Sequence, residues 1–370
     1  MSFINIVENY NPQQVEKLAQ LTTSEQVLEV LSKDQLSQND FLKLLSPAAS
    51  SHLEAMAQRA NQLTLQHFGR GVLLYTPLYL ANHCANRCVY CSFNIKNDIS
   101  RMQLTLEEIE KEAKAISKEG FRHILLLTGE HRGKTPVSYI IDAVKVMKKY
   151  FDGISIEIYS LTEAEYREVI AAGVSGLTIY QETYDRDRYK KLHLSGPKSN
   201  YQIRLDTPED GAKAGMNFIN IGALLGLTEG IYDAFMTGLH GAYLQKNYPS
   251  VEYGLSLPRM RPHIGEFQDF TPIEDPFFVQ ALLAYRIFLP SMSINISTRE
   301  APAFREKLIP LGATNLSAGV STQVGGHTDS EETSAPQFEI ADERSLSQMQ
   351  EVIRQMGYQP VLKNWSGDFS

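Results

Sequence analysis

The chain has 370 residues, a formal net charge of -8 and a pI near 5.7. The acidic balance argues against nucleic-acid binding, which requires concentrated Lys and Arg. No stretch approaches the roughly 20 apolar residues of a membrane span, and the N-terminus lacks the pattern of a signal peptide. We therefore expect a cytoplasmic protein, and its partners are predicted to be small molecules or proteins rather than nucleic acid or membrane.

Residues 1–70 are predicted to form a helical N-terminal extension. In residues 49–69, apolar side chains such as Met56, Ala60 and Leu63 recur at spacings of three and four, and the stretch ends at Gly69. This period is typical of an amphipathic helix with a glycine stop. No pattern in the extension indicates catalysis.

From residue 71, short β-rich runs alternate with amphipathic segments. One such segment begins with a capping box, Thr105 with Glu108, and stops at Gly120, and residues 162–173 repeat the device. Eight such units predict an α/β fold with a (β/α)8 barrel of the TIM type over residues 71–320, and an open, doubly wound sheet is the alternative. The candidate strands are residues 72–80, 123–129, 154–159, 176–181, 217–225, 251–257, 293–297 and 313–319.

Residues 321–370 are predicted to cover the barrel as a third region. Residues 324–345 are polar and rich in small side chains, which favours a covering loop, and residues 342–370 favour one helix and a tail. We expect His327 to be an exposed loop residue and Trp365 to be a packing anchor. The segment SLPRMRPHIGEF, after the sixth strand, either lines the site or builds a loop.

All three cysteines lie in the stretch NHCANRCVYCSFN, just after the first candidate strand. Their spacing lets one loop direct Cys84, Cys88 and Cys91 at a single inorganic centre, and thiolates suit zinc, copper or iron-sulfur clusters. His83 is the nearest fourth ligand for zinc, but its place directly before Cys84 makes joint ligation awkward. A four-iron cluster normally takes four thiolates, so three would leave one iron open.

The segment CANRCVYC resembles the cluster loop of the radical S-adenosylmethionine (SAM) enzymes, in which three cysteines bind a 4Fe-4S cluster. This resemblance implies that SAM binds the open iron through its amino and carboxylate groups, and that Tyr90 contacts the adenine. The segment TGE resembles the part of the family that meets the SAM amino group, which singles out Gly129 and Glu130.

Later segments extend the resemblance to SAM binding. Glu182 follows the fourth candidate strand, and Arg204 begins the next helix; the family commonly uses such residues for the ribose hydroxyls and the SAM carboxylate. Surface salt bridges are the alternative for both residues. The segment IGALLGL, which contains Gly222, resembles the strand beside the adenine ring.

The order of these segments across nearly the whole chain resembles the 2-iminoacetate synthase family of tyrosine lyases. That resemblance implies cleavage of the Cα–Cβ bond of L-tyrosine to 2-iminoacetate (dehydroglycine) and p-cresol, for thiamine thiazole biosynthesis. It also implies thiazole synthase and a flavodoxin or ferredoxin reductant as partners.

Other family members and other classes give competing interpretations. No cysteine follows Cys91, which disfavours biotin synthase and the hydrogenase maturase that also cleaves tyrosine, because both need further cysteines. A lyase of another aromatic amino acid, such as tryptophan, shares the single-cluster layout and stays an alternative. A zinc-stabilised binding module without catalysis is the alternative from a different class.

Arg299, which follows the seventh candidate strand, is the predicted grip on the substrate. A guanidinium group can hold a carboxylate through two hydrogen bonds, a geometry that Lys provides less well. The resemblance implies a nearby serine with the same task, and Ser297 and Ser317 are the candidates. An ion pair of Arg299 with Glu300 or Glu306 is the structural alternative.

Overall fold

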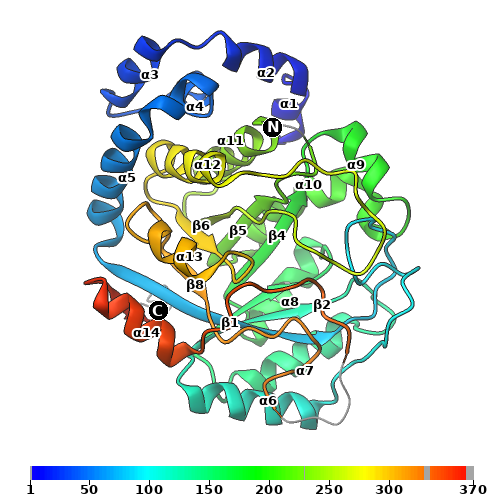
Figure 1. The fold of residues 1–370 in the computed structure, drawn as a ribbon. Coiled ribbons are helices and arrows are strands. Elements are labelled where there is room, and N and C mark those ends of the chain that lie inside the picture. The colour runs from blue at the N-terminus through cyan, green and yellow to red at the C-terminus, as the bar shows by residue number, and fades with distance from the viewer. Residues whose placement is uncertain (1, 229, 329–333, 364–370) are drawn as a thin grey trace.

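The computed structural model describes residues 2–228, 230–328 and 334–363, and its central feature is a closed barrel of eight parallel strands (Figure 1). All eight candidate strands are present, so the TIM-type barrel is confirmed and the open, doubly wound sheet is wrong. The strands are β1 (Gly71–Ala81), β2 (His123–Thr128), β3 (Gly153–Glu157), β4 (Gly176–Glu182), β5 (Phe218–Ala223), β6 (Glu252–Ser256), β7 (Ser293–Ile296) and β8 (Asn315–Ser317).

Strand β1 closes the barrel because it pairs with a different neighbour along each half. Residues 73–75 pair with residues 315–317 of β8, and residues 76–81 pair with residues 124–128 of β2. Both backbone edges of β1 are therefore used, and no open edge separates β2 from β8. Because every strand runs the same way, the carboxyl ends of all eight meet at one rim.

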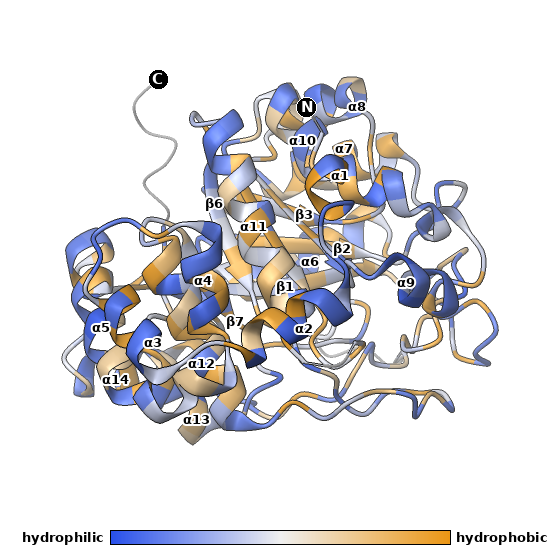
Figure 2. Cartoon of the chain, turned by 90° about the horizontal axis from the view of Figure 1, so that it is seen from above, coloured by the Kyte–Doolittle hydropathy of each residue, from blue (hydrophilic) through white to orange (hydrophobic). Residues whose placement is uncertain are grey.

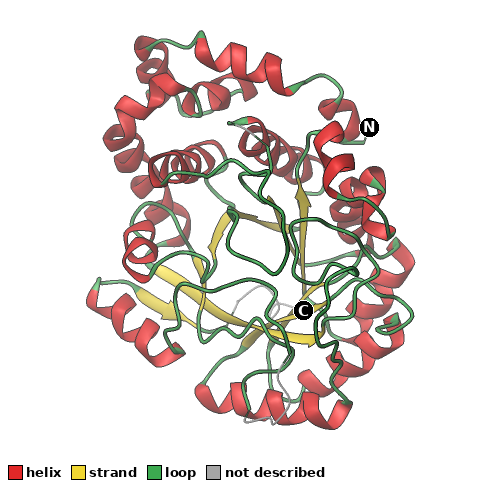
Figure 3. Ribbon diagram, turned by 45° about the vertical axis from the view of Figure 1, so that its right-hand side comes forward, coloured by secondary structure: helices red, strands yellow, loops and turns green. Residues whose placement is uncertain are grey.

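Helices surround the strands on the outside, as Figure 3 shows. The predicted capping box of Thr105 and Glu108 is present, and Gly120 ends that helix with φ 108°. None of the helices formed by the described residues has the length and apolar character that crossing a bilayer requires. The outer helices are α6 (Leu106–Glu119), α7 (Val137–Met147), α8 (Glu163–Ala172), α9 (Arg186–Leu192), η2 (Pro197–Ser199), α10 (Tyr201–Ala214), α11 (Tyr232–Asn247), α12 (Asp275–Phe288) and α13 (Pro302–Leu308).

The N-terminal extension is helical, as predicted, and lies across α11 and α12. The ring of Phe3 stacks on His240 of α11 with ring centres 4.1 Å apart, and Phe41 stacks on Phe288 of α12 at 4.4 Å. Figure 2 shows hydrophobic residues concentrated on the strands and along α11. The elements of the extension are α1 (Ile4–Val7), α2 (Pro12–Gln20), α3 (Ser24–Leu31), α4 (Gln38–Leu44), η1 (Pro47–His52) and α5 (Leu53–Phe68).

The C-terminal region contains the predicted helix, α14 (Leu346–Gln355), and a strand that the sequence did not predict. This strand, β9 (Gln359–Val361), pairs in parallel with residues 71–73 of β1. It is only three residues long, so it shows no alternation that would indicate a strand. Trp365 lies outside the described residues, and the proposed division near residues 70 and 320 falls at the two ends of the barrel strands.

The prediction of an exposed His327 is wrong. Its ring Nε2 lies 3.1 Å from the carbonyl oxygen of Pro77, and its backbone N–H donates to Glu112. Burial lowers the pKa of His327. The side chain thus helps to fix the segment that crosses the barrel rim, and polar composition alone did not indicate these two contacts.

The covering segment is described over residues 320–328 and 334–345, and its end is held to the barrel by a buried ion pair. Asp342 and Arg305 of α13 are in direct contact, and both side chains are fully buried. Arg305 also donates to the carbonyl of Ser317, and the backbone N–H of Ala341 donates to the carbonyl of Thr298 over 2.8 Å. Arg344 also pairs with Asp342, so removal of Asp342 is the change that would leave a buried charge, the Arg305 guanidinium group, without an ion-pair partner.

Replacing Asp342 by Ala should therefore destabilise the fold by about 3–5 kcal/mol, because Arg305 stays buried without its carboxylate. The shift of the urea-unfolding midpoint measures this cost. Asp142→Ala is the matched control, since Asp142 pairs with Lys145 on the surface, and its effect should stay within about 0.5 kcal/mol. Equal midpoints for the two variants would contradict the anchoring role.

Candidate active site

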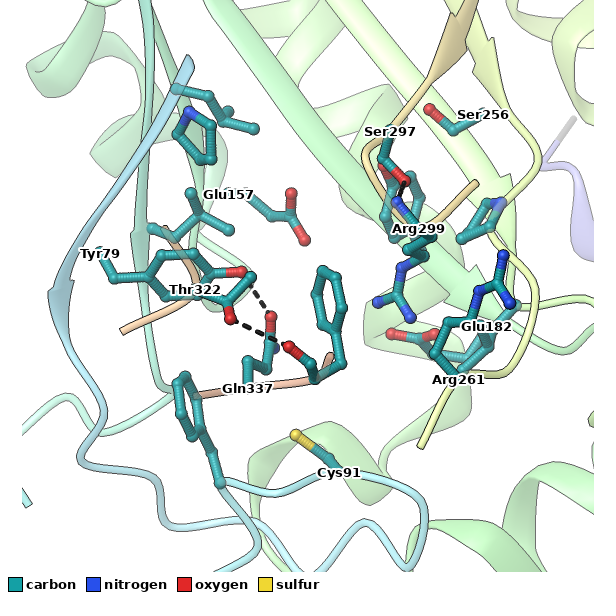
Figure 4. Close-up of a pocket in the computed structure, with 18 of the residues that line it drawn as sticks. Tyr79, Cys91, Glu157, Glu182, Ser256, Arg261, Ser297, Arg299, Thr322 and Gln337 are labelled. Atoms are coloured by element: carbon teal, nitrogen blue, oxygen red, sulfur yellow. Dashed lines mark hydrogen bonds between the residues drawn. The ribbon is translucent and has the colours of Figure 1, made fainter. Parts of the chain in front are cut away.

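One cavity opens at the rim where the carboxyl ends of the strands meet (Figure 4). Residues from all eight strands or the loops directly after them line it, together with residues of the covering segment. In barrels of this kind the carboxyl-end rim carries the chemistry. The predicted site residues can therefore be judged by whether they reach this cavity.

Cys84, Cys88 and Cys91 all line the cavity. Their loop is fixed by polar contacts: the backbone N–H of Asn86 donates to the sulfur of Cys84 over 3.4 Å, and the Asn94 side chain donates to the carbonyl of Cys88 over 2.9 Å. The loop therefore presents three thiols to one space, as the spacing predicted.

The environment of these thiols suits a cationic inorganic centre. Burial raises the pKa of all three, that of Cys91 to about 11, and the neighbouring thiols add to the shift at Cys88 and Cys91. Bound iron would supply the positive charge that stabilises three clustered thiolates. The donor set therefore fits an iron-sulfur cluster with one iron left open.

His83, the zinc ligand considered from the sequence, is not among the residues that line the cavity. Across the described residues, no three His, Cys, Asp or Glu side chains converge closely enough to hold a single metal ion.

Gly129 and Gly222 both permit a close approach of backbone, but at different places. A Cβ at Gly129 would lie 2.3 Å from the carbonyl oxygen of His83, where the cysteine loop begins. A Cβ at Gly222 would lie 2.6 Å from the carbonyl oxygen of Ser256 on the neighbouring strand. Gly129 lines the cavity and Gly222 is not among the lining residues, so strand packing explains Gly222 and its adenine contact stays a prediction.

Four charged side chains form a buried network beside the cysteine loop. Arg204 donates to Glu130 over 2.9 Å and to the carbonyl of Tyr180 over 2.8 Å, and Lys198 donates to Glu182 over 2.6 Å. Glu182 adopts φ 69°, a strained conformation for a residue with a side chain, at a bulge that ends β4. The motif residues Glu130, Glu182 and Arg204 are thus brought together and are not surface salt bridges.

The network favours the charged forms of Glu182 and Lys198. Burial opposes ionisation of Glu182, but Lys198 and Arg204 outweigh it and hold the pKa of that carboxyl below its ordinary value. Burial likewise opposes charge on Lys198, while Glu182 and Glu130 raise the pKa of the ammonium group. Fixed charges of both signs can bind a ligand that carries both an ammonium and a carboxylate group.

Tyr90 lies within the cysteine loop, between Cys88 and Cys91, where it is buried and lines the cavity. Its hydroxyl lies 2.7 Å from Nε2 of His193, whose other ring nitrogen lies 2.9 Å from the carbonyl oxygen of Tyr189. Leu224 and Leu227 belong to the same apolar cluster as Tyr90. Tyr90 therefore has an apolar setting suited to a flat ring, and His193 holds it in place.

Arg299, Ser297 and Ser317 lie together on the other side of the cavity. The guanidinium carbon of Arg299 lies 3.5 Å from the ring centre of Phe338. The hydroxyl of Ser297 accepts from the backbone N–H of Arg299 over 3.4 Å, and that of Ser317 accepts from the N–H of Thr298 over 3.2 Å. The three predicted substrate-binding residues are therefore neighbours.

Within the described residues, Arg299 forms no ion pair, so the structural alternative of a pair with Glu300 or Glu306 is wrong. Burial lowers the pKa of its guanidinium group, which shows the cost of leaving it without a counter-ion. The two carboxylates have other partners, since Glu300 pairs with Arg259 and Arg261, and Glu306 pairs with Arg344.

The covering segment closes over the cavity through hydrogen bonds to β1 and to itself (Figure 4). Tyr79 donates to the side-chain oxygen of Gln337 over 2.7 Å, and Thr322 donates to the carbonyl of Phe338 over 2.9 Å. A covering loop was predicted here, and the structure shows which of its residues reach the cavity. This closure limits the access of water to the site.

The motifs did not indicate three of the lining residues, Glu157, Lys198 and Gln337. Glu157 carried a signal, because it is the single charge within the apolar run ISIEIY. Lys198 lies in the short helix η2 and Gln337 lies in the covering segment, and neither stretch has a distinguishing sequence pattern. Only the fold brings these two side chains to the rim.

Comparisons with known proteins agree with this arrangement. A parallel barrel with three cysteines after its first strand defines a radical SAM enzyme, and the family described as "Radical SAM superfamily" matches residues 78–236. A second description, "Biotin and Thiamin Synthesis associated domain", matches residues 256–359, from β6 to β9.

The sequence relatives define the family more closely. The chain is 39% identical to the 2-iminoacetate synthase of Escherichia coli (strain K12) over 344 residues, which cover 93% of this chain and 91% of the relative. It is 38% identical to the 2-iminoacetate synthase of Salmonella typhimurium over the same shares of the two chains. The chain therefore belongs to the 2-iminoacetate synthase family, which favours an enzyme over the zinc-stabilised binding module.

Solved structures share the fold. The FeFe-hydrogenase maturase HydG from Carboxydothermus hydrogenoformans matches with a TM-score of 0.85 and 30% identity, over 98% of this chain and 83% of that chain. Methylornithine synthase (PylB) matches with a TM-score of 0.75 and 22% identity, over 93% and 98% of the two chains.

Gly129→Ala should lower the iron bound after anaerobic reconstitution, because the added Cβ would meet the backbone at His83 and displace the cysteine loop. Iron and sulfide per chain are the measured quantities. Gly71→Ala is the matched control, since its nearest contacts would lie at an ordinary 3.5 Å. Wild-type iron content in the Gly129→Ala protein would contradict this account of the loop.

Proposed function

We propose that this protein cleaves the Cα–Cβ bond of L-tyrosine to 2-iminoacetate (dehydroglycine) and p-cresol, for thiamine thiazole biosynthesis. The observation that carries the proposal is the cavity itself. In a chain 39% identical to a 2-iminoacetate synthase, three clustered thiols and Arg299, which has no ion-pair partner among the described residues, open into one space. The three thiols suit an iron-sulfur cofactor, and the guanidinium group of Arg299 suits an amino-acid carboxylate.

Cys84, Cys88 and Cys91 would hold a 4Fe-4S cluster whose open iron binds SAM. When bound, these cofactors supply a carbon-centred radical that removes a hydrogen atom from the amino group of the substrate. Glu130 and Glu182 offer acceptors for amino and hydroxyl groups, and Arg204 offers donors for a carboxylate. The residues proposed for SAM are Tyr90, Gly129, Glu130, Glu182, Arg204 and Gly222. We also propose Lys198, because it lines the cavity and pairs with Glu182.

Arg299 would hold the carboxylate of tyrosine, with Ser297 and Ser317 beside it. The guanidinium group is largely shielded from water by burial, and a charge-assisted hydrogen bond is strong in such a setting. This grip fixes the amino group and the Cα–Cβ bond relative to the cofactors. The covering segment, which Tyr79 of β1 holds through Gln337, would keep water from the reactive species.

The proposed partners follow from the chemistry. The imine product is unstable in water, so a thiazole synthase that consumes it is the expected acceptor, and a flavodoxin or ferredoxin would deliver the electron. We propose that these reactions take place in the cytoplasm, where a reducing environment keeps the three cysteines free to bind iron.

The proposal predicts p-cresol from anaerobically reconstituted protein supplied with SAM, a strong reductant and L-tyrosine. Product analysis by chromatography and mass spectrometry is the measurement. Formation of 5′-deoxyadenosine without cleavage of tyrosine would refute the proposal. Tryptophan is the parallel substrate, and release of an indole product in place of p-cresol would assign the protein to the other class of aromatic lyase.

Arg299→Lys should lower kcat/KM for tyrosine by about tenfold to a hundredfold, because one ammonium group replaces a bidentate, charged contact. This fall in kcat/KM should come mainly from a higher KM, which is measured from initial rates of p-cresol release. Arg167→Lys is the matched control, since Arg167 is exposed on α8 and pairs with Glu163. An unchanged KM in the Arg299→Lys protein would exclude the proposed grip.

A further inference from the structure

Four carboxylates line the cavity, and three of them have partners. Glu130 pairs with Arg204, Glu182 pairs with Lys198, and Glu300 is held by two arginines. Among the described residues, Glu157 alone of the four has neither an ion pair nor a hydrogen bond. A partly buried carboxylate without a partner costs free energy, so its presence in a cavity points to a ligand group.

The surroundings of Glu157 indicate what kind of ligand this is. Glu157 is the last residue of β3 and pairs in register with Leu127 of β2. One apolar cluster lies in this part of the cavity wall. Its buried members, all of which line the cavity, are Leu125, Leu127, Tyr79 and Phe93. An apolar wall that ends at a carboxylate suits an aromatic ring that carries a hydrogen-bond donor.

Glu157 also faces the residue proposed to bind the substrate carboxylate. Figure 4 shows the side chains of Glu157 and Arg299 directed into the same space from two sides. A molecule that satisfies both has an anionic group at one end and a donor at the other. Tyrosine has this form, with a carboxylate, an aromatic ring and a phenolic O–H.

The electrostatics of Glu157 favour a donor as its partner. Loss of water raises the pKa of Glu157 to about 7, and Glu182 adds to the shift, while Arg204, Lys198 and Arg299 oppose it. Burial therefore disfavours the charged form of this carboxyl group. A hydrogen bond from a ligand stabilises the charged form.

We propose that Glu157 accepts a hydrogen bond from the phenolic O–H of the substrate and so selects tyrosine over phenylalanine. This inference rests on the proposed function, which supplies tyrosine as the substrate. Phenylalanine would leave the carboxylate in the same site without a partner, and a site built to bind a hydroxyl group rejects the analogue that lacks it.

The test is a binding measurement with Glu157→Leu and Glu157→Gln. Protein reconstituted with cluster and SAM, but without reductant, is dialysed against labelled L-tyrosine or L-phenylalanine, so that no turnover occurs. Glu157→Leu should lower the preference for tyrosine over phenylalanine by about tenfold to a hundredfold, because a hydrogen bond to a charged group is lost. Glu157→Gln keeps the shape and an acceptor oxygen without the charge, so its loss should be smaller but in the same direction.

Glu168→Leu is the matched control, since Glu168 is exposed on α8, outside the barrel. It should bind both amino acids as the wild type does. Iron content and thermal unfolding show whether each variant is folded and loaded. If Glu157→Leu does not hold iron, the preference of Glu157→Gln for tyrosine over phenylalanine tests the proposal instead.

The outcomes separate this inference from the proposed function. An unchanged preference in folded Glu157→Leu protein would overturn the inference, and so would equal weakening of tyrosine, phenylalanine and SAM, which would assign Glu157 to the cofactor. Wild-type protein that prefers tyrosine through Glu157 but releases no p-cresol would uphold this inference and refute the proposed function.

Discussion

Strand β1 pairs with β8 along its first half and with β2 along its second, and the rest of the site depends on this double pairing. The cysteine loop leaves the carboxyl end of β1, and Arg299 follows β7 on the same rim. The pairing with β8 holds these two parts of the cavity at a fixed separation. An open sheet would place β2 and β8 at opposite edges, far from any shared ligand.

The charged and ionisable groups inside the cavity fall into two sets, those with an ion-pair partner and those without one. Groups that shape the site are already paired, as Glu182 is with Lys198 and Glu130 is with Arg204. Among the described residues, the three free thiols, Arg299 and Glu157 have no ion-pair partner. Paired charges are already oriented when a ligand binds. Burying a polar group without a partner costs free energy, so the unpaired groups mark the points where contact with a ligand would offset that cost.

Much of this arrangement could be predicted from local patterns. The eight strands and the capped helices follow from short-range periodicity, and the cysteine spacing indicated the metal centre before any fold was known. Arg299 could be placed because it follows a predicted strand at the rim. These features depend on residues close to one another in the sequence.

The remainder depends on contacts between distant segments. Lys198 meets Glu182, and Gln337 meets Tyr79 across 258 positions of the sequence, and neither pair has a local signature. His327 appeared exposed because its composition gave no sign of its contact with Pro77. Strand β9 is too short to show a period, and Gly222 is explained by a neighbouring carbonyl that only the sheet register reveals.

The central claim is that three thiols at the rim hold a four-iron cluster and leave one iron for SAM. Mössbauer spectroscopy of anaerobically reconstituted protein, with and without SAM, tests it most directly. The account predicts a 4Fe-4S cluster in which one iron changes its signal when SAM is added, and loss of that cluster in Cys88→Ala. Stoichiometric zinc without iron, or a cluster whose irons do not respond to SAM, would contradict it.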